Sequence, residues 1–205
     1  MDLKFARRAV GAAMLAAILG ATAALAQPAP VRVRGTIEKV DGLVLTVKSR
    51  DGAMLTVKLP DNVAVAATTK RSLADIKPND FVGIAAMPQP GGPSRALEVL
   101  IFPEAARGTG EGHYPWDLMP QSTMTNATVS ETVTKVDGHT LTLKYKNGEQ
   151  TIIVPPETPI VTVVPADKSE LKPGATIFIF AATRAEDGSL SAARVTIGRD
   201  IAPPM

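Results

Sequence analysis

The sequence has no cysteine, which excludes disulfide bonds, thiolate nucleophiles and cysteine-ligated zinc or iron–sulfur sites. It has only two histidines in 205 residues, and it lacks both a glycine-flanked serine elbow and a His-Glu-x-x-His pair. A nucleophile, a base and an orienting residue therefore cannot be assigned from its motifs. We expect a protein that is not an enzyme and that holds no cofactor.

Aromatic residues are scarce, at 4% of the chain, and a surplus of basic charge is missing as well. The first 26 residues hold three of the 22 basic and one of the 20 acidic residues, which leaves 19 of each. A neutral chain lacks the broad positive face of a general nucleic-acid binder. Four phenylalanines lie in apolar runs and are expected in the core rather than on a base-stacking surface: Phe81, Phe102, Phe178 and Phe180. We expect no nucleic-acid partner.

Apolar runs of bilayer length are absent after residue 26, so we expect no membrane span in the mature chain. The N-terminus itself has basic residues, an apolar run over 9–25, and the small-residue ending Ala24-Leu25-Ala26 before Gln27. This pattern is typical of a signal peptide. We expect residues 1–26 to be removed, which makes the protein periplasmic or otherwise secreted. The alternative is a retained N-terminal anchor, although the run is shorter than the roughly 20 residues of a membrane-spanning helix.

What the sequence does contain is an internal repeat. Lys39-Val40-Asp41-Gly42 recurs as Lys135-Val136-Asp137-Gly138, and the strand-like stretch 45–48 recurs as 141–144. Both matches have the same offset of 96 residues. Self-similarity at a fixed spacing indicates a duplicated structural unit.

The two copies remain alignable further along the chain. The turn-like Asp75-Ile76-Lys77-Pro78-Asn79 matches 170–174 at an offset of 95, so a single gap aligns the copies. We therefore place module 1 at 31–103, a linker at 104–125 and module 2 at 126–200. We expect each module to fold on its own, because each contains a full set of strand and turn signals.

Within a module the hydrophobic pattern has a period of two, as in 43–48, where Leu and Val alternate with polar residues. Asp-Gly or Asn-Gly pairs at 41–42, 51–52, 137–138 and 147–148 favour tight hairpins, so neighbouring strands should be antiparallel. The only helical pattern is one turn before the fourth strand. We expect an all-β protein with two tandem small OB-like five-stranded antiparallel barrels joined by a Gly/aromatic linker. A bare meander is the alternative.

These motifs carry a resemblance to known proteins. The Val-Asp-Gly turn, the Thr-Val-Lys strand, the proline-ended strand and the stretch Ser72–Asp80 resemble exported bacterial OB-like domains of unknown function, here in two tandem copies. The resemblance implies the fold and export, and it brings no catalytic residues. The linker stretch 108–118 is similar to that of proteobacterial exported proteins loosely labelled metal-transport permeases. A permease needs several membrane spans, so that label does not fit this sequence.

The linker concentrates the rare side chains of the chain, and it matches neither module. Glycines with aromatic and ionisable residues are typical of ligand-binding loops, so we predict a ligand-binding or partner-binding site there. The competing interpretation is a structural plug in which the aromatic and apolar linker residues fold back between the barrels. The predicted site residues are Glu111, His113, Tyr114, Trp116 and Asp117.

Taken together, these patterns favour a non-catalytic periplasmic binding or adaptor protein whose partner is an envelope protein or a small ligand. The alternative is a metal-binding or small-ligand-binding protein of the cell envelope that uses the linker. For a metal, the linker offers one nitrogen and two oxygen ligands, from His113, Glu111 and Asp117, with His139 available from module 2. These residues show no regular spacing, and a firm transition-metal site needs three or four converging ligands. The prediction therefore names no metal ligands.

Overall fold

The computed structural model describes residues 30–135, 138–199 and 201 of the chain. Its regular structure within these ranges consists of strands and three 3₁₀ helices, which confirms the all-β prediction. The helices are η1 (Leu73–Asp75), η2 (Glu104–Ala106) and η3 (Lys168–Glu170). No helix in these ranges is long and apolar enough to cross a membrane. The predicted signal peptide, 1–26, lies outside the described residues.

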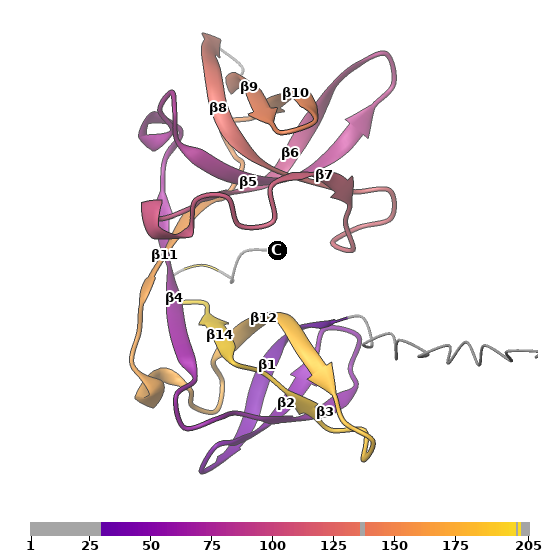
Figure 1. Ribbon diagram of the computed structural model, residues 1–205, viewed down its shortest axis with the longest axis vertical. Helices are drawn as coiled ribbons and strands as arrows, with labels where there is room; N and C mark the ends of the chain where they lie inside the picture. The colour runs from indigo at the N-terminus through magenta and orange to yellow at the C-terminus, as the bar shows by residue number, and fades with distance from the viewer. Residues whose placement is uncertain (1–29, 136–137, 200, 202–205) are drawn as a thin grey trace, which may run out of the picture.

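The strands close two five-stranded rings, which are the lower and upper barrels of Figure 1. In the first ring the pairing runs β1–β2–β3–β13–β12 and returns to β1. A closed ring gives every strand two paired neighbours, although a stretch that extends past its partner, such as 31–34 of β1, can still present a free edge. Its members are β1 (Val31–Asp41), β2 (Val44–Ser49), β3 (Met54–Lys58), β13 (Leu190–Ser191) and β12 (Thr176–Arg184).

The second ring repeats this order with the remaining strands. The pairing runs β8–β9–β10–β6–β5 and returns to β8. The parallel β10–β6 pair corresponds to the parallel β3–β13 pair of the first ring, so the two rings have the same pattern of strand directions. Its members are β8 (Thr123–Lys135), β9 (Gly138–Tyr145), β10 (Gly148–Val154), β6 (Gly92–Ile101) and β5 (Phe81–Gln89).

The rings differ from the expected arrangement in one respect: neither is built from a single module. The first combines β1–β3 of module 1 (31–103) with β12 and β13 of module 2 (126–200). The second combines β8–β10 of module 2 with β5 and β6 of module 1. The two copies of the repeat have therefore exchanged their last strands, and each copy contributes to both barrels.

The exchange is made by β4 (Ala64–Arg71) and β11 (Ile160–Pro165), which run side by side between the barrels in Figure 1. They pair antiparallel along six residues, and Thr68 lies opposite Val163, its own counterpart at the repeat offset of 95. Equivalent positions that face each other in an antiparallel pair indicate a local pseudo-two-fold axis. Each strand crosses from one barrel to the other, and the β4–β11 ladder satisfies backbone hydrogen bonds along the crossing.

Each crossing strand also pairs with one further strand on its outer edge. β14 (Arg194–Ile197) pairs parallel to β4, and β6 pairs parallel to β11. The barrels and the crossing strands thus form one continuous hydrogen-bonded sheet.

Each barrel has its own apolar core, and both cores draw on both modules. In the first core Val33, Leu45 and Val47 of module 1 pack with Ile177 and Ile179 of module 2, all at most 1% exposed. Burial of one such side chain stabilises the fold by about 1.5 to 3 kcal/mol. The second core has the same mixed origin, with Val82 and Ile84 from module 1 and Leu141, Leu143 and Ile152 from module 2. Removal of either half would expose both cores.

The turn predictions hold for the first copy. Gly42 and Gly52 have φ angles of 57° and 89°, in the left-handed region that glycine adopts without strain. In the second copy β9 and β10 also form a tight antiparallel hairpin, although Gly148 is the first residue of β10, opposite Tyr145, and not a turn residue. Asp137 lies outside the described residues.

Candidate functional site

The linker is an ordered part of the second barrel. After η2 it forms β7 (Gly112–Pro115), which pairs antiparallel with the first half of β8, from Gly112 opposite Asn126 to Pro115 opposite Thr123. The same stretch of β8 pairs with β5 on its other edge. The linker therefore adds a strand to the barrel wall.

Trp116 follows β7 and is only 7% exposed. Its ring stacks on Phe180 of β12 at a centroid distance of 6.1 Å and meets the edge of Tyr114 at 6.1 Å. Beneath it, Met124 and Ala85 belong to the same apolar cluster. Trp116 thus joins the outer wall of the second barrel to the first barrel, as the plug interpretation predicts.

Two arginines of β1 complete this contact. The Cζ atom of Arg32 lies 4.0 Å from the centroid of the Trp116 ring, and that of Arg34 lies 4.9 Å from the Phe178 ring. Such cation–π contacts are worth about 0.5 to 2 kcal/mol, depending on how far they are removed from water. Phe180 is 48% exposed and stacks in this cluster, so the prediction that it belongs to the core is wrong. It lies on the outer face of its strand.

Asp117 forms ion pairs with the same two arginines. Arg34 Nη2 donates a hydrogen bond of 2.9 Å to Asp117 Oδ1, and Arg32 Nη1 lies 3.5 Å from Asp117 Oδ2. Burial alone would raise the pKa of Asp117, but the Arg34 hydrogen bond and the two positive charges outweigh it. The pKa of Asp117 consequently lies below its usual value.

The remaining linker residues of the predicted site have separate partners. His113 Nδ1 lies 2.8 Å from Thr125 Oγ1, and burial lowers the pKa of His113. Glu111 Oε1 accepts a 2.9 Å hydrogen bond from the backbone N–H of Lys146. Tyr114 Oη lies 3.3 Å from Asn126 Nδ2, and burial raises the pKa of Tyr114.

These side chains do not form a metal centre. Within the described residues no group of three or more His, Cys, Asp or Glu side chains could hold a metal ion. Trp116 and Asp117 lie at the junction of the barrels, whereas Glu111 and His113 bind to the β9–β10 turn and to β8. The structure therefore brings together only Tyr114, Trp116 and Asp117 of the five predicted residues.

Beside Asp117 lies a cavity of about 330 Å³, which we call the arginine groove. It borders β1, the β2–β3 turn and the end of β12, and it contains four arginines and two aspartates. Its lining residues are Val31, Arg32, Val33, Arg34, Ser49, Arg50, Asp51, Ala53, Leu55, Asp117 and Arg184.

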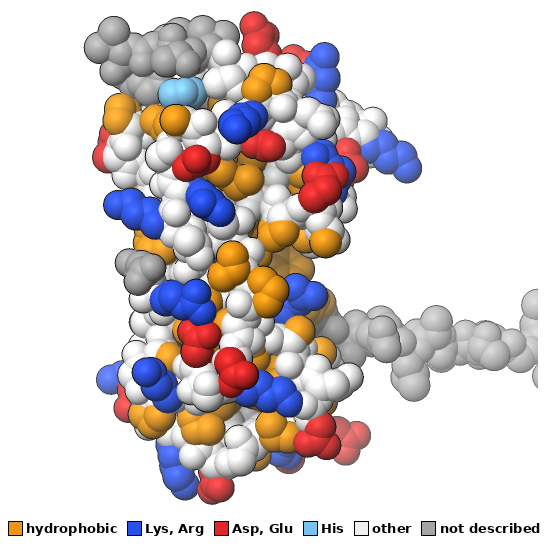
Figure 2. Space-filling view, turned by 90° about the vertical axis from the view of Figure 1, so that its left-hand side faces the viewer, with side chains coloured by type: hydrophobic (Ala, Val, Ile, Leu, Met, Phe, Trp, Pro, Cys, Tyr) orange, Lys and Arg blue, Asp and Glu red, His pale blue; other side chains and the backbone are white. Residues whose placement is uncertain are grey.

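Sequence reasoning did not find this groove. Arg50 comes from module 1, Arg184 from module 2 and Asp117 from the linker, so only the strand exchange brings them together. One signal was present: in Val31-Arg32-Val33-Arg34 the alternation places two arginines on one face of a strand. The overall neutrality of the chain conceals this local positive charge. On the face shown in Figure 2, basic and acidic side chains are interspersed over both barrels.

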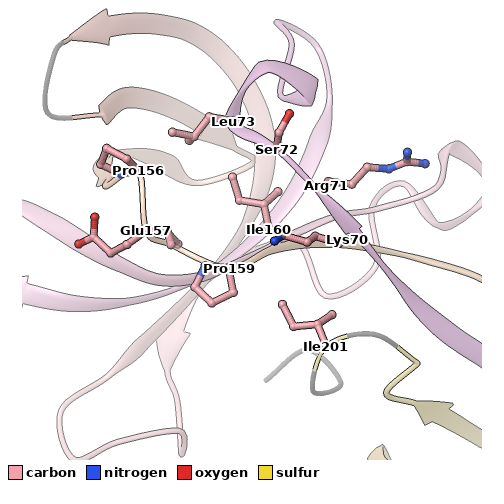
Figure 3. Close-up of a pocket in the computed structure, with 10 residues that line it drawn as sticks. Lys70, Arg71, Ser72, Leu73, Pro156, Glu157, Pro159, Ile160 and Ile201 are labelled. Atoms are coloured by element: carbon pink, nitrogen blue, oxygen red, sulfur yellow. The ribbon is translucent and has the colours of Figure 1, made fainter.

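A second cavity, of about 460 Å³, lies where β4 and β11 separate toward the second barrel (Figure 3). Leu73, Pro159 and Ile160 line it, and Ile201 lies across from them in the figure. Its acidic group, Glu157, is already paired with Arg95 at 2.7 Å. The rest of the lining is mixed, because Lys70, Arg71, Ser72 and Thr158 lie beside the apolar residues.

Comparison with protein-family models, with curated proteins and with solved structures finds no match to this chain.

Proposed function

We propose that this chain is a non-catalytic periplasmic binding or adaptor protein whose two barrels are OB-like and whose arginine groove binds an anionic ligand or an acidic partner. Export rests on the signal pattern of residues 1–26. The binding role rests on the groove, where four guanidinium groups outnumber two carboxylates. Such a site selects for carboxylate or phosphate.

The observation that carries this proposal is the fixed orientation of Arg32 and Arg34. The guanidinium groups form cation–π contacts with Trp116 and Phe178, and their Nη atoms form ion pairs with Asp117. Their Nε atoms are buried, and among the described residues neither has a hydrogen-bond partner. Guanidinium groups that are already ordered lose less side-chain entropy when they bind, which favours affinity.

A carboxylate already occupies part of this site. Asp117, which is half-exposed, lies against both arginines, so the groove accommodates the chemistry that we propose for its ligand. Arg50 and Arg184 lie in the same groove, and each donates a hydrogen bond to a backbone carbonyl, of Leu118 at 3.4 Å and of Gly188 at 3.3 Å. They are the cations best placed to receive a second anion.

Titration of the mature protein, residues 27–205, with inorganic phosphate tests the site directly. Trp116 is the only tryptophan of the chain and contacts Arg32, so its fluorescence reports on the groove. We expect a saturable change that is lost in R50A/R184A. The matched control R95A removes an arginine of the second barrel that pairs with Glu157, and it should respond like the unaltered protein.

Affinity capture from the native envelope extends the test to partners. A partner retained by the unaltered protein and by R95A but lost by R50A/R184A supports the proposal. If R50A/R184A retains the same partners as the unaltered protein, the proposal is contradicted. Mass analysis of the exported protein should give a chain that starts at Gln27, and a start at Met1 would refute export with cleavage.

A further inference from the structure

The two barrels have equivalent first strands, β1 and β8. Thr36 of β1 pairs with Lys48 of β2 on one edge and Thr176 of β12 on the other. Thr128 of β8 pairs with Lys144 of β9 and with Phe81 of β5. These neighbours are themselves counterparts in the repeat, so Thr36 and Thr128 occupy equivalent places. Residues 31–34 of β1 then correspond to residues 123–126 of β8.

The equivalent stretches differ in what covers their edges. Residues 123–126 of β8 pair with β5 on one edge and with β7 on the other. Residues 31–34 of β1 pair with β12 on one edge, while β2 begins to pair only at Gly35. Among the described residues no strand pairs with the second edge of 31–34.

The arginine groove lies at this uncovered edge. Its lining includes all four residues of 31–34 together with the β2–β3 turn, which flanks the edge. The backbone carbonyl of Arg34 accepts a 2.8 Å hydrogen bond from the N–H of Arg50, and this bond marks the end of the β1–β2 ladder. The place that β7 fills in the second barrel is therefore an open groove in the first.

From this difference we infer that the edge of residues 31–34 binds an extended acidic segment of another protein as an added strand. The inference rests on the proposed function, since it specifies the ligand of the same groove. Strand addition gives affinity through backbone hydrogen bonds and specificity through alternate side chains. β7 provides the template for it within this molecule.

The charges select an acidic segment. Arg32, Arg34, Arg50 and Arg184 face two aspartates in the groove, which leaves an excess of positive charge. The second barrel gives a parallel: Glu111, which directly precedes β7, accepts a hydrogen bond from the N–H of Lys146, the counterpart of Arg50. In the second barrel, a carboxylate next to the added strand β7 thus already forms a hydrogen bond with the equivalent turn.

The test uses the mature protein and a short synthetic peptide of alternating glutamate and valine. We expect it to bind and to slow amide hydrogen exchange at residues 31–34. An otherwise identical peptide with N-methyl groups on alternate backbone nitrogens keeps its charge but cannot form the ladder. Loss of two backbone hydrogen bonds should weaken binding by about tenfold. A lysine–valine peptide should not bind.

The outcomes separate this inference from the proposed function. If both acidic peptides bind equally, or if inorganic phosphate binds but the peptide does not, the groove is an anion site without strand addition and the inference is overturned. If neither phosphate nor peptide binds, the proposed function falls as well. Protection of residues 31–34 that rises with protein concentration in the absence of peptide would assign the edge to a second copy of the chain and overturn the inference.

The variant R50A/R184A provides the last control. Arg50 and Arg184 line the groove and belong to neither apolar core, so the protein should fold and still exchange its core amides slowly. Binding of the acidic peptide should fall by about tenfold or more, as expected for the loss of two charge-assisted contacts. Unchanged binding would show that the peptide does not use the groove.

Discussion

The two barrels share one strand order but differ at one edge. In the second barrel β7 covers residues 123–126 of β8, whereas the corresponding residues 31–34 of β1 border an open groove. Among the described residues, the linker pairs with the edge of β8, and no strand pairs with the second edge of 31–34. The two barrels of the described chain therefore differ in surface although they share one strand order.

The largest expected effect follows from the strand exchange that the barrels share. A fragment of residues 27–105 or 124–205 lacks two strands of one ring and three strands of the other, and both cores need residues from both halves. We expect neither fragment to form a cooperatively folded monomer, which is a loss of the whole folding free energy of about 5 to 15 kcal/mol. Circular dichroism and size-exclusion chromatography check this.

Mixing the two fragments is the control for that experiment. The mixture should regain β structure, because the missing strands of each ring are then supplied in trans. A monomeric fragment with a cooperative unfolding transition would show instead that each module closes alone, as the repeat pattern suggests. The pairing of β1 with β12 would then not be needed for stability.

The second expected effect concerns the contact that makes the barrels unequal. W116A removes a buried indole that packs with Met124 and forms a cation–π contact with the Arg32 guanidinium. We expect a loss of about 3 kcal/mol in the free energy of unfolding, within the range for large-to-small changes at buried aromatic residues. Urea unfolding followed by circular dichroism measures it. M119A, at a 49% exposed position in the same segment, should change stability by less than about 0.5 kcal/mol.

A smaller effect is expected at the ion pairs of Asp117. Its pKa is lowered in the folded state, so its contribution to stability is present above the unfolded pKa of about 3.9 and is lost as the pH falls through the folded pKa. We expect D117N to cost under about 1 kcal/mol at pH 7, because the side chain is half-exposed. The difference from the unaltered protein should disappear in strong acid.

The matched control for Asp117 is E157Q, which breaks the more exposed pair with Arg95 on the second barrel. Unfolding midpoints of both variants across the pH range give the comparison. Equal losses for the two variants would mean that the cluster of arginines around Trp116 adds nothing to an ordinary surface ion pair. Such a result would remove the distinction between the junction and the rest of the surface.

The smallest expected effect lies at His113, beneath the covered edge. Burial lowers the pKa of His113, so the folded state favours the neutral ring. Its contribution to stability is complete above the unfolded pKa of about 6.5 and declines as the pH falls toward the folded pKa. Titration of the ring protons by NMR should give a midpoint below 6.5. A midpoint at or above 6.5 would contradict the burial of this ring beside Thr125.

The predicted site shows how far the linker sequence could lead. The aromatic residues near 114–118 correctly indicated a packed segment, because a solvated linker is usually built from polar residues and glycine. The neighbours of Trp116 could not be predicted. Phe180 and Arg32 lie far from it in the sequence and belong to different modules, and Phe180 was expected in the core. Alternation along β12 places it on the outer face.

The arginine groove marks the limit of composition as a guide. A neutral chain excludes a broad basic face, but it says nothing about four arginines that meet over one cavity. Charge is a sum over the sequence, whereas recognition depends on local arrangement. Arg184 is more than 130 residues away from Arg50, and only the exchange of β12 into the first barrel makes them neighbours.

The sequence by itself determined the all-β class and the hairpin turns of the first copy, and its two similar segments remain a prediction of duplication. These features depend on local patterns: alternation of apolar residues, glycine in tight turns and a repeat at a fixed offset. Only the tertiary structure decided which segment completes which barrel, because the local strand and turn patterns do not specify the partner of each strand. The connection through β4 and β11 selects between them, and with it the tertiary structure decided which edge remained open.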